Sequence, residues 1–492
     1  MRNETFDVLV IGSGGAGLRA AIAAREEGSR VLVMTKCSAG LASSTLISNG
    51  FFAVTGAGNP VEQHVAATLE AGYGMNDPRM VRILSEEAPE RLKEMEARGA
   101  RFRETPNALV CTRPPPDSGR DAVNVLLAWA RSRGVEFLEW TTAASLITEG
   151  KRVAGCFGVQ RDGGGVTVRS RAVVLCTGGA SALFAFHDNP SACTGDGYAL
   201  AAGAGARVRD LEFAQFYPLI AMEPHAPKTL VQPFLAEAGR IRNSLGEDLI
   251  EKYDLAAFRP VALRARDRLS RAMFAEYRSG NEVHLDLRSL GKGDWDNTTG
   301  HNVRDYFVAR FRADEKPVRI MPVAHFTMGG IVVDEQGATD LPGFYAAGET
   351  VTGLHGANRL GGNALTETLV FGYRAGRAAA RFAAADKGPE GPAMTQPPPD
   401  LEQCLNGTYP PREALIRLKN SLWQGCGPVR NEEGLRMALD TVRQLRTAGL
   451  RLGGHARLPD AVAVLNGLTA AELMLQAALD RKESIGAHFR ED

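Results

Sequence analysis

The sequence lacks the paired cysteines that bind metals, clusters or haem. No two cysteines have CxxC spacing, and none precedes the histidine of a haem-attachment motif. A zinc ribbon, a ferredoxin-type cluster and a c-type haem are therefore not expected, and we predict no metal site. The cysteines are odd in number and scattered, which suits a reducing compartment: Cys37, Cys111, Cys156, Cys176, Cys193, Cys404 and Cys426.

Net charge and long apolar runs are also absent. The chain has 57 Lys and Arg residues against 57 Asp and Glu residues, so it lacks the basic excess of a typical nucleic-acid-binding protein. We find no run of about 18 or more apolar residues, and the chain enters a strand at Phe6 without a signal peptide. The sequence therefore predicts a cytoplasmic protein with no direct membrane span and no nucleic-acid partner.

Glycine, by contrast, is abundant, and its first cluster follows a buried strand. The apolar run Asp7–Ile11 predicts a parallel strand, and GSGGAG follows it at 12–17. Leu18–Glu27 then predicts a helix and Arg30–Met34 a second strand. This setting favours a dinucleotide site over a merely structural turn, with phosphates at the helix N-terminus. The predicted contacts are Gly12, Ser13, Gly14, Gly15, Ala16 and Gly17.

The second predicted strand lacks the acidic residue that usually holds a ribose in dinucleotide-binding folds. Met34-Thr35-Lys36 occupies that place. The hydroxyl group of Thr35 can hydrogen-bond a ribose. The alternative, of equal weight, is that Thr35 only ends the strand and has no role in binding. We predict cofactor contacts at Thr35 and Lys36 and leave both roles of Thr35 open.

Two further strand–glycine junctions occur far along the chain. Val173–Gly179 is a buried strand that ends in glycines, and TGDG follows at 194–197. Leu341–Glu349 is a second junction and ends in an acid. Several distant strand ends with glycine suit an extended ligand, longer than one nucleotide. Asp196 and Glu349 are candidates for polar ligand contacts, although each alone is more often a helix cap.

The order of these motifs resembles the flavoprotein subunits of fumarate reductase and succinate dehydrogenase, together with L-aspartate oxidase. HGANRLGGNAL and ARDRLSRA are specific to this resemblance, whereas GxGxxG alone is not. The resemblance implies an FAD-dependent oxidoreductase acting on CH–CH bonds. The matching stretches span nearly the whole chain: GSGGAG at 12–17, LCTGG at 175–179, TGDG at 194–197, EFAQFYP at 212–218, AEAGRIRN at 236–243, ARDRLSRA at 265–272, PVAHFTMGG at 322–330, GFYAAGE at 343–349, HGANRLGGNAL at 355–365 and RKESIGAHFRED at 481–492.

The resemblance also implies an α/β fold with three parts: a Rossmann-like FAD-binding domain, an inserted α+β capping domain and a C-terminal helical domain. The sequence agrees, because charged helical stretches interrupt the strand–glycine pattern and a Pro- and Gly-rich segment predicts a linker. We expect the FAD-binding domain at 1–219 and 325–386, the capping domain at 220–324, the linker at 387–400 and the helical domain at 401–492, with helices over Arg412–Leu422, Asn431–Leu450 and Asp460–Ala478.

The resemblance implies that the FAD is bound non-covalently. In respiratory members of the family, the histidine of a Ser-His-Thr stretch forms a bond to the flavin, and here Ser43-Ser44-Thr45 has Ser44 in that place. Serine cannot make this linkage by the same route. Asn49 and Gly50 close the segment and are expected near the flavin ring. The other cofactor contacts implied by the resemblance are Thr177, Gly178, Asp196, Glu349, Arg359, Asn363, Ala364 and Leu365.

The resemblance places one substrate carboxylate on Arg359 and His325. A planar guanidinium suits this role because it binds a carboxylate through two parallel hydrogen bonds. Arg266 matches the proton-donating arginine of the family, with Asp267 and Glu237 as the carboxylates that resupply its proton. An arginine is almost always protonated, so this role requires such a relay.

The other end of the substrate site departs from the family. The family sequence His-Pro-Thr is Tyr217-Pro218-Leu219 here, and the threonine before the relay glutamate is Ala236. In the dicarboxylate enzymes those residues hold the second carboxylate, and burying a carboxylate without partners is costly. We therefore expect a substrate whose second end is not a carboxylate in the usual pose. The alternative is that Tyr217 donates its hydroxyl hydrogen and fumarate still fits.

These expectations define a principal hypothesis and two alternatives. The principal one is hydride transfer between flavin N5 and the C–C double bond of a small unsaturated carboxylic acid. The alternatives are an L-aspartate-oxidase-like amino acid oxidase and a flavin electron-transfer subunit without an organic substrate. Because the sequence holds no haem or iron–sulfur motif, electrons are expected from a redox partner protein or a soluble carrier.

Overall fold

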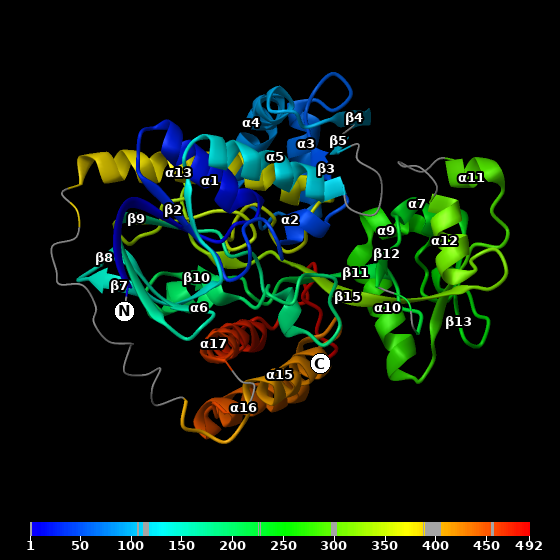
Figure 1. Ribbon diagram of the computed structural model, residues 1–492. Coiled ribbons are helices and arrows are strands. Elements are labelled where there is room, and N and C mark those ends of the chain that lie inside the picture. Colours follow the sequence, from blue (N-terminus) through cyan, green and yellow to red (C-terminus); the bar gives the residue numbers. More distant parts are fainter. Residues whose placement is uncertain are drawn as a thin grey trace.

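The computed structural model describes residues 2–105, 108–111, 118–224, 226, 228–296, 303–386, 388, 405–453 and 457–492. The expected linker at 387–400 lies outside these residues except for Gly388. The described chain forms three parts (Figure 1): a central sheet with helices on both faces, a mixed α+β unit to one side, and a set of helices beneath the sheet. The fold class predicted from the sequence is confirmed.

The central sheet is the expected α/β core. Its strands run β6-β2-β1-β9-β8-β7, and β17 also pairs with β9. The pairs β6–β2, β2–β1, β1–β9 and β17–β9 are parallel, whereas β7, β8 and β9 pair antiparallel. The bounds are β1 Arg2–Ile11, β2 Val31–Met34, β6 Glu136–Leu138, β7 Thr141–Glu149, β8 Arg152–Gln160, β9 Gly165–Leu175 and β17 Phe344–Ala346.

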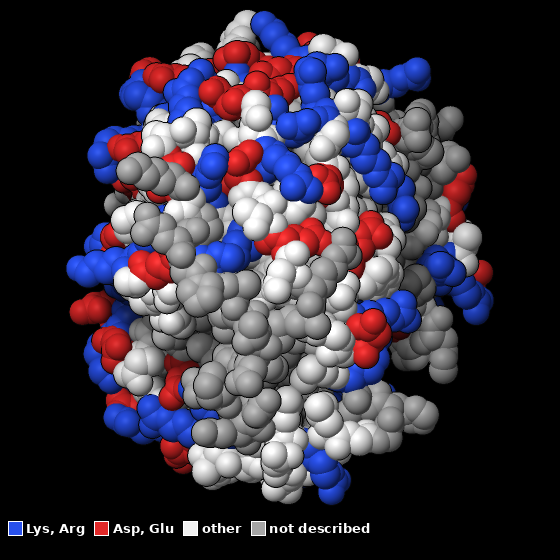
Figure 2. All heavy atoms as spheres, turned by 60° about the vertical axis from the view of Figure 1, so that its left-hand side comes forward, with Lys and Arg blue, Asp and Glu red and all other residues white. Residues whose placement is uncertain are grey.

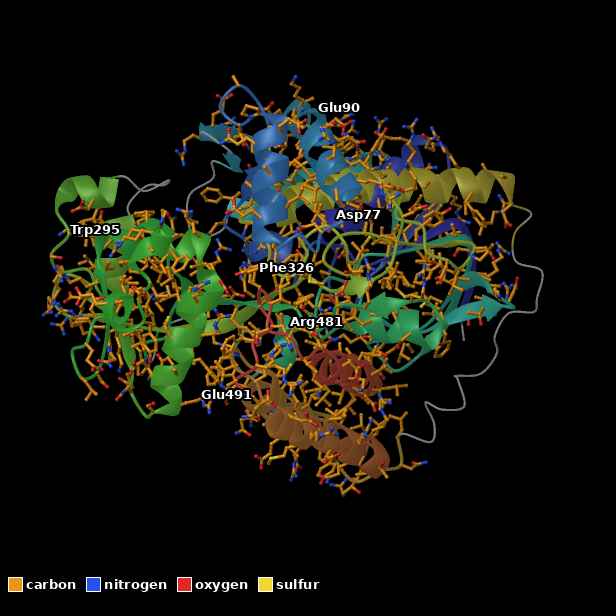
Figure 3. The ribbon with its side chains drawn as sticks, turned by 180° about the vertical axis from the view of Figure 1, so that it is seen from behind. Asp77, Glu90, Trp295, Phe326, Arg481 and Glu491 are labelled. Carbon is orange, nitrogen blue, oxygen red and sulfur yellow. The ribbon has the colours of Figure 1, made fainter. Side chains whose placement is uncertain are left out.

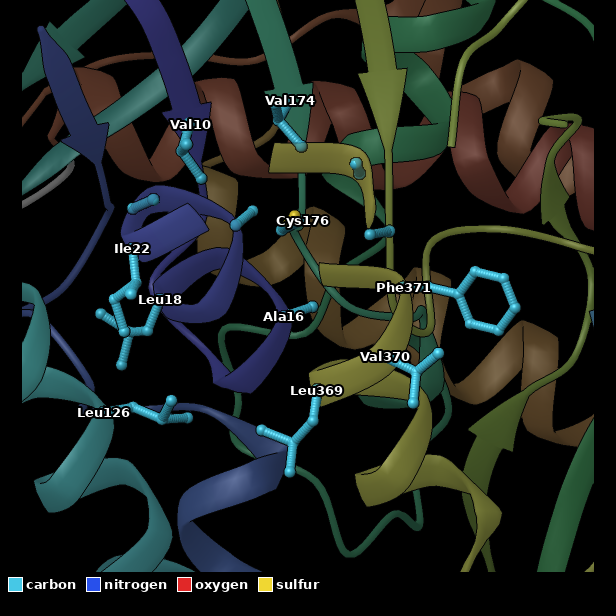
Figure 4. Close-up of a cluster of buried hydrophobic side chains, with 14 of the residues drawn as sticks. Val10, Ala16, Leu18, Ile22, Leu126, Val174, Cys176, Leu369, Val370 and Phe371 are labelled. Atoms are coloured by element: carbon cyan, nitrogen blue, oxygen red, sulfur yellow. The ribbon is translucent and has the colours of Figure 1, made fainter. Parts of the chain in front are cut away.

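Both faces of β1 are buried, which explains its uninterrupted apolar sequence. Val8 and Val10 belong to the cluster formed with helices α1 (Gly15–Glu26) and α13 (Asn363–Ala385), and Figure 4 shows part of this cluster. Leu9 and Ile11 point to the opposite face, with α6 (Asp196–Gly203). The two helices α1 and α13 approach closely, because a Cβ atom on Gly376 of α13 would lie 2.1 Å from the carbonyl oxygen of Ala20.

A smaller layer covers the N-terminal side of α13. It contains a three-stranded antiparallel sheet, β3–β5–β4, and helices that pack against α1 and α13. Its elements are α2 Ser44–Ile47, β3 Phe51–Ala53, α3 Val61–Ala71, α4 Pro78–Ala97, β4 Phe102–Thr105, β5 Ala108–Cys111 and α5 Ser118–Ser132. β10 (Val208–Arg209) and β16 (Gly330–Ile331) form a separate two-stranded antiparallel sheet, and Ser181–Leu183 is a 3₁₀ turn.

The α+β unit is built on two long strands that leave the central domain and pair with each other. These are β11 (Ala214–Ala221) and β15 (Val318–Thr327), and the sheet runs β12-β11-β15-β14-β13. The unit has its own buried cluster, which reaches from Tyr217 to Val323. Its other elements are β12 Thr229–Leu230, α7 Pro233–Ala238, β13 Arg240–Asn243, α8 Leu249–Lys252, the 3₁₀ turn Ala256–Phe258, α9 Val261–Arg264, α10 Arg266–Arg278, β14 Val283–Asp286, α11 Lys292–Asp296 and α12 Val303–Phe311.

The C-terminal helices are α15 (Pro411–Cys426), α16 (Glu432–Ala448) and α17 (Leu458–Asp480), at the positions that periodicity predicts. Helix α17 is long and apolar enough to span a membrane, with a mean hydropathy of 1.5, but 61% of that window is buried. It packs against α6, α15, α16 and β7, so it serves as a core helix in this fold. The segment after α17 returns to the α+β unit, where Glu491 pairs with Arg278 at 3.0 Å.

Acidic and basic side chains alternate on the surface. Figure 2 shows both signs intermixed on the face drawn, without a field of one sign. This distribution agrees with the net charge of zero and offers no basic surface for nucleic acid on that face. Figure 3 shows the side chains from behind, with Phe326 at the junction between the α+β unit and the central domain and Trp295 at the outer end of the unit.

Candidate functional site

A cavity of about 1270 Å³ lies between the carboxyl ends of the central strands and the α+β unit. One side of its wall comes from the predicted cofactor segments and the other from β11, β15 and α10. The predicted residues in the wall are Gly12, Ser13, Gly14, Gly15, Ala16, Thr35, Lys36, Ser43, Ser44, Thr45, Asn49, Thr177, Gly178, Asp196, Tyr217, Arg266, His325, Glu349, Arg359, Ala364 and Leu365. Ligands of open α/β sheets bind at this edge.

The first glycine cluster forms a cradle at the N-terminus of α1. Gly12 has φ +109°, and a Cβ atom there would lie 2.1 Å from the carbonyl oxygen of Cys176. Gly14 is the N-cap residue of α1. Because glycine has no side chain, no N-cap side chain covers the first turn of the helix where it faces the cavity. The amide of Gly15 donates to Oγ1 of Thr45 at 3.1 Å. This geometry suits phosphate groups at a helix N-terminus.

Three predicted cofactor residues do not line the cavity. Gly17 packs against the turn, because a Cβ atom there would lie 2.0 Å from the carbonyl oxygen of Gly12. Gly50 has φ +68° and lies beyond the wall. Asn363 is fully buried and bonds to His64 (2.8 Å) and Thr68 (3.1 Å). These residues support the loops around the cavity instead of facing it, since their side chains or backbone are enclosed by protein.

The end of β2 is joined to α6 by an ion pair. Nζ of Lys36 lies 2.6 Å from Oδ2 of Asp196 and 3.1 Å from Oγ1 of Thr194. Asp196 is therefore not a simple helix cap, the alternative that the sequence left open. Oγ of Ser13 donates to Oγ1 of Thr35 at 2.9 Å, so Thr35 both ends the strand and presents its side chain to the cavity wall.

Glu349 is the acid at the end of the third strand–glycine junction. Its Oε1 accepts a hydrogen bond from the backbone amide of Thr327 at 3.0 Å, and it does not cap a helix. Burial raises the pKa of this carboxyl to about 7, against the opposing effects of the Thr327 amide and Arg359. An acid in this setting is close to half-protonated near neutral pH when the cavity holds no ligand.

Glu349 should make the flavin-free protein less stable as the pH rises. Its pKa is about 7 in the folded chain and ordinarily 4.5, so between these values the folded state holds the proton more tightly than the unfolded state. The stabilisation present below pH 4.5 is lost as the pH rises through 7. The free energy of unfolding of the Glu349→Gln variant, measured in urea, should exceed that of the parent by less than about 1 kcal/mol at pH 5 and by roughly 3 kcal/mol at pH 8. Parallel pH profiles would contradict this burial effect.

Arg359 is buried at the substrate side of the cavity, with 6% of its surface exposed. Its Nη2 donates to Oε1 of Gln215 at 3.2 Å, and its Cζ lies 4.5 Å from the ring centroid of Phe326. Its Nε has no hydrogen-bond partner among the described residues. Burial lowers the pKa of Arg359 to about 9, and the nearby charge of Arg266 adds to this.

Arg266 is the first residue of α10 and points into the same cavity. Its Nε donates to the carbonyl oxygen of Ala262 at 3.0 Å, and its Cζ lies 5.2 Å from the ring centroid of Tyr217. Burial lowers the pKa of Arg266. Neither Arg266 nor Arg359 forms an ion pair with a carboxylate of the described residues. The structure thus brings two buried cations together with His325, as the resemblance implied.

The predicted proton relay is not assembled in this conformation. Asp267 pairs with Arg271 at 3.3 Å and Glu237 with Arg259 at 2.9 Å, and neither lines the cavity. Asp267 follows Arg266 directly in the helix, so their side chains project from different faces. Among the described residues, no hydrogen bond or ion pair joins either carboxylate to Arg266, and their role as its proton supply stays a prediction.

Tyr217 lines the cavity with its ring and not with a free hydroxyl group. Its hydroxyl donates to the carbonyl oxygen of Val231 at 2.8 Å, and its ring centroid lies 5.3 Å from that of His325. The single hydroxyl hydrogen is therefore engaged by the backbone. The alternative in which Tyr217 donates it to a substrate carboxylate does not fit this arrangement. Ala236 is buried and lies outside the wall.

Two polar residues in the cavity wall and a third behind Arg359 were not predicted from the sequence. Asp188 contacts His325, with Oδ2 2.7 Å from Nδ1, and Asn189 donates to the carbonyl oxygen of His325 at 2.7 Å. Gln215 also holds Arg359 from β11, because its Nε2 donates to the Arg359 carbonyl oxygen at 3.0 Å. EFAQFYP and the segment before TGDG carry these residues, but their roles depend on contacts between distant segments.

The fold and the cavity define a dinucleotide-binding oxidoreductase with a capping unit over the ligand site. Its extended cavity begins at a glycine-rich helix N-terminus and ends at a cluster of buried cations.

Comparison with known proteins gives the family. Residues 7–365 match the FAD binding domain family, and residues 416–492 match the fumarate reductase flavoprotein C-terminal family. A fumarate reductase (CoM/CoB) subunit of Methanothermobacter marburgensis is 31% identical over 100% of this chain and 95% of that protein. An L-aspartate oxidase of Streptomyces coelicolor is 34% identical over 99% of this chain and 88% of that protein. The FrdA protein of E. coli quinol fumarate reductase has a TM-score of 0.88 at 27% identity, covering 100% of this chain and 92% of that one.

The chain belongs to the fumarate reductase and succinate dehydrogenase flavoprotein family, which includes L-aspartate oxidase. Its cofactor is FAD, and it is an FAD-dependent oxidoreductase of that type. The resemblance stated from the motifs is thereby confirmed.

Proposed function

We propose that this protein transfers a hydride between FAD and the C–C bond of a small unsaturated carboxylic acid, with one substrate carboxylate held by Arg359 and His325. One observation carries the proposal. The guanidinium groups of Arg359 and Arg266 are both buried in one cavity, and no carboxylate of the described residues pairs with either. Two unpaired buried cations are costly, and an anionic ligand relieves that cost.

The residues at the other end of the cavity fit FAD. Gly12 permits the tight turn after β1, and Gly14 gives the N-terminus of α1 no side-chain cap, which suits phosphate groups there. Glu349 lines the same cavity and offers a carboxylate to hydroxyl groups. When bound, FAD supplies the site that accepts or donates the hydride. Ser44 donates its hydroxyl hydrogen to Asn189 at 2.6 Å, and a serine here supports the proposal that the flavin is held without a covalent bond.

The chain's own residues then have distinct tasks. Arg359 binds the carboxylate and polarises the adjacent double bond, since its fork matches a carboxylate. Gln215 and Phe326 fix the guanidinium plane of Arg359. Arg266 lies in the same cavity and is proposed to deliver the proton, with Glu237 and Asp267 as its proton supply. The ring of Tyr217 forms the cavity wall beside Arg266 and His325.

A redox partner protein or soluble carrier is proposed as the electron source. No group of three or more His, Cys, Asp or Glu residues in the described chain is placed to hold a metal ion. A cytoplasmic location is part of the proposal and is supported by the scattered cysteines.

A second candidate is oxidation of L-aspartate. The observation in its favour is the 34% identity with the Streptomyces coelicolor enzyme over nearly the whole chain. Such a substrate carries two carboxylates, whereas Tyr217 and Ala236 provide no donor for the second one. Release of hydrogen peroxide in air with L-aspartate, but not with an unsaturated acid, would favour this candidate.

Anaerobic reoxidation of the chemically reduced protein tests the proposal. We expect an unsaturated monocarboxylic acid to restore the oxidised flavin absorption far faster than a blank without acceptor. An aryl-acrylate, a heteroaryl-acrylate and fumarate form the panel, because they share one carboxylate and differ at the other end. Failure of all three to reoxidise the flavin would overturn the proposal. Fast reoxidation by fumarate alone would show that the second carboxylate is accommodated despite the Tyr217–Val231 bond.

A further inference from the structure

A carboxylate lies in the substrate-side wall of the cavity, where the proposed reaction does not require one. Oδ2 of Asp188 is 2.7 Å from Nδ1 of His325, and both residues line the cavity. Asn189 fixes the pair by donating to Oδ1 of Asp188 at 3.1 Å and to the His325 carbonyl oxygen at 2.7 Å. Ser44 donates to Asn189 in turn, so one hydrogen-bonded chain links the cofactor side to the substrate side.

We propose that Asp188 determines the substrate class: it orients His325 toward one substrate carboxylate and excludes a second carboxylate from the cavity. The substrate is then an unsaturated monocarboxylic acid whose distal group is neutral and planar. This inference rests on the proposed function of Arg359 and Arg266 and names the substrate class of that same site.

The orientation follows from which nitrogen Asp188 occupies. A carboxylate that accepts a hydrogen bond from Nδ1 leaves Nε2 as the ring atom available to a ligand. No described residue hydrogen-bonds Nε2 of His325, and the side chain is 22% exposed, along the cavity wall. Asp188 and Asn189 therefore hold the imidazole in one pose before the substrate arrives, as positioning residues.

The exclusion of a second substrate carboxylate follows from the buried charges around the cavity. Arg359 and Arg266 contribute two positive charges and Asp188 one negative charge, and all three side chains are nearly enclosed. One substrate carboxylate brings this group to neutrality, whereas a second would leave an unpaired buried anion beside Asp188. Lys228 and Arg310 also line the cavity, and both side chains reach solvent, which weakens the effect of their charges. Partial burial lowers the pKa of Lys228 and the charge of Asp188 opposes this, while Nζ of Lys228 donates to the carbonyl oxygen of His187.

The walls around Asp188 suit a flat neutral group. The rings of Tyr217 and Phe326 and the side chain of Ile220 line the cavity, and the Tyr217 hydroxyl is bonded to Val231. Aromatic walls favour a planar ligand through stacking or edge contacts. Asp188 accepts bonds from His325 and Asn189 and retains lone pairs for a donor on that ligand.

The Asp188→Asn variant of the full FAD-loaded chain tests the inference, with cinnamate and fumarate as acceptors and reduced methyl viologen as donor. The parent should favour cinnamate in kcat/KM. The amide has the same size without the charge, so KM for fumarate should fall by about tenfold, which corresponds to ~1.4 kcal/mol. KM for cinnamate should stay within about threefold of the parent. A merely structural role would raise both KM values or lower both kcat values without changing the preference.

Asp305→Asn is the matched control, because Asp305 lies on α12 with its side chain 69% exposed and outside the cavity wall. It should leave both acceptors unchanged. If Asp188→Asn does not bind FAD, the inference is tested on the parent by measuring ligand affinity from flavin difference spectra. In that test 3-phenylpropionate should bind more tightly than succinate. Tighter succinate binding, a parent that prefers fumarate, or an unchanged preference in Asp188→Asn would overturn the role of Asp188. Failure of both acids to reoxidise the flavin would instead overturn the proposed function.

Discussion

Replacing Arg359 with methionine should lower kcat/KM for the unsaturated acid by about a thousandfold, or roughly 4 kcal/mol. Methionine retains much of the apolar stem that packs on Phe326 but removes both the charge and the fork that holds a carboxylate. The effect is large because the site is buried, where water cannot replace the lost partner of the substrate anion. Steady-state kinetics with an artificial electron donor would measure it, with flavin absorbance confirming that FAD remains bound.

Arg381→Met provides the matched control for this substitution. Arg381 lies on α13 with 58% of its side chain exposed, and neither it nor its partner Glu27 lines the cavity. This variant should retain the parental kcat/KM. A retained kcat/KM in Arg359→Met would show that Arg359 does not hold the substrate carboxylate.

The cofactor half of the site could be predicted from short stretches of sequence. Gly12–Gly17 lies directly after β1, so its position at the strand end and at the start of α1 follows from the local pattern alone. The predicted helix began at Leu18, whereas α1 begins at Gly15, because the glycines of the cradle already form its first turn. Asp196 and Glu349 were predicted to contact the ligand and both line the cavity, whereas their partners Lys36 and Thr327 come from distant segments.

The substrate half depends on contacts that no local pattern contains. Arg359, Arg266 and His325 could be placed only through the resemblance, and Asp188 not at all, because its contact with His325 joins positions 137 residues apart. The proposed relay carboxylates Glu237 and Asp267 pair with Arg259 and Arg271 in the fold, which no local pattern indicates, and their roles stay predictions.

Two strands explain why the cofactor half and the substrate half of the site meet at the junction between the central domain and the α+β unit. β11 and β15 pair with each other in the sheet of the α+β unit, and residues of both strands line the cavity beside the central domain. β11 carries Gln215 and Tyr217, and β15 carries His325 and Phe326, so both strands deliver wall residues at the junction. A change in the packing of the α+β unit would therefore alter the substrate side directly, while the glycine cradle on α1 would keep its shape.

Replacing Gly12 with alanine should abolish stable FAD binding and lower the yield of folded protein. An alanine at φ +109° is strained, and its Cβ atom would lie 2.1 Å from the carbonyl oxygen of Cys176, so the turn between β1 and α1 must move. That shift would displace the amides of the first helical turn from the phosphate position. The combined cost should exceed about 3 kcal/mol, which amounts to more than a hundredfold loss of FAD affinity.

Gly28→Ala separates backbone strain from this steric effect. Gly28 follows α1 with φ +93°, yet nothing lies within 4 Å of the position that a Cβ atom would take. This variant should lose about 1 kcal/mol of stability and still bind FAD like the parent. FAD content after gel filtration and flavin fluorescence titration measure both variants. Equal loss of FAD in the two would show that general destabilisation is responsible, whereas loss confined to Gly12→Ala places the pyrophosphate at the close approach of the β1–α1 turn to Cys176.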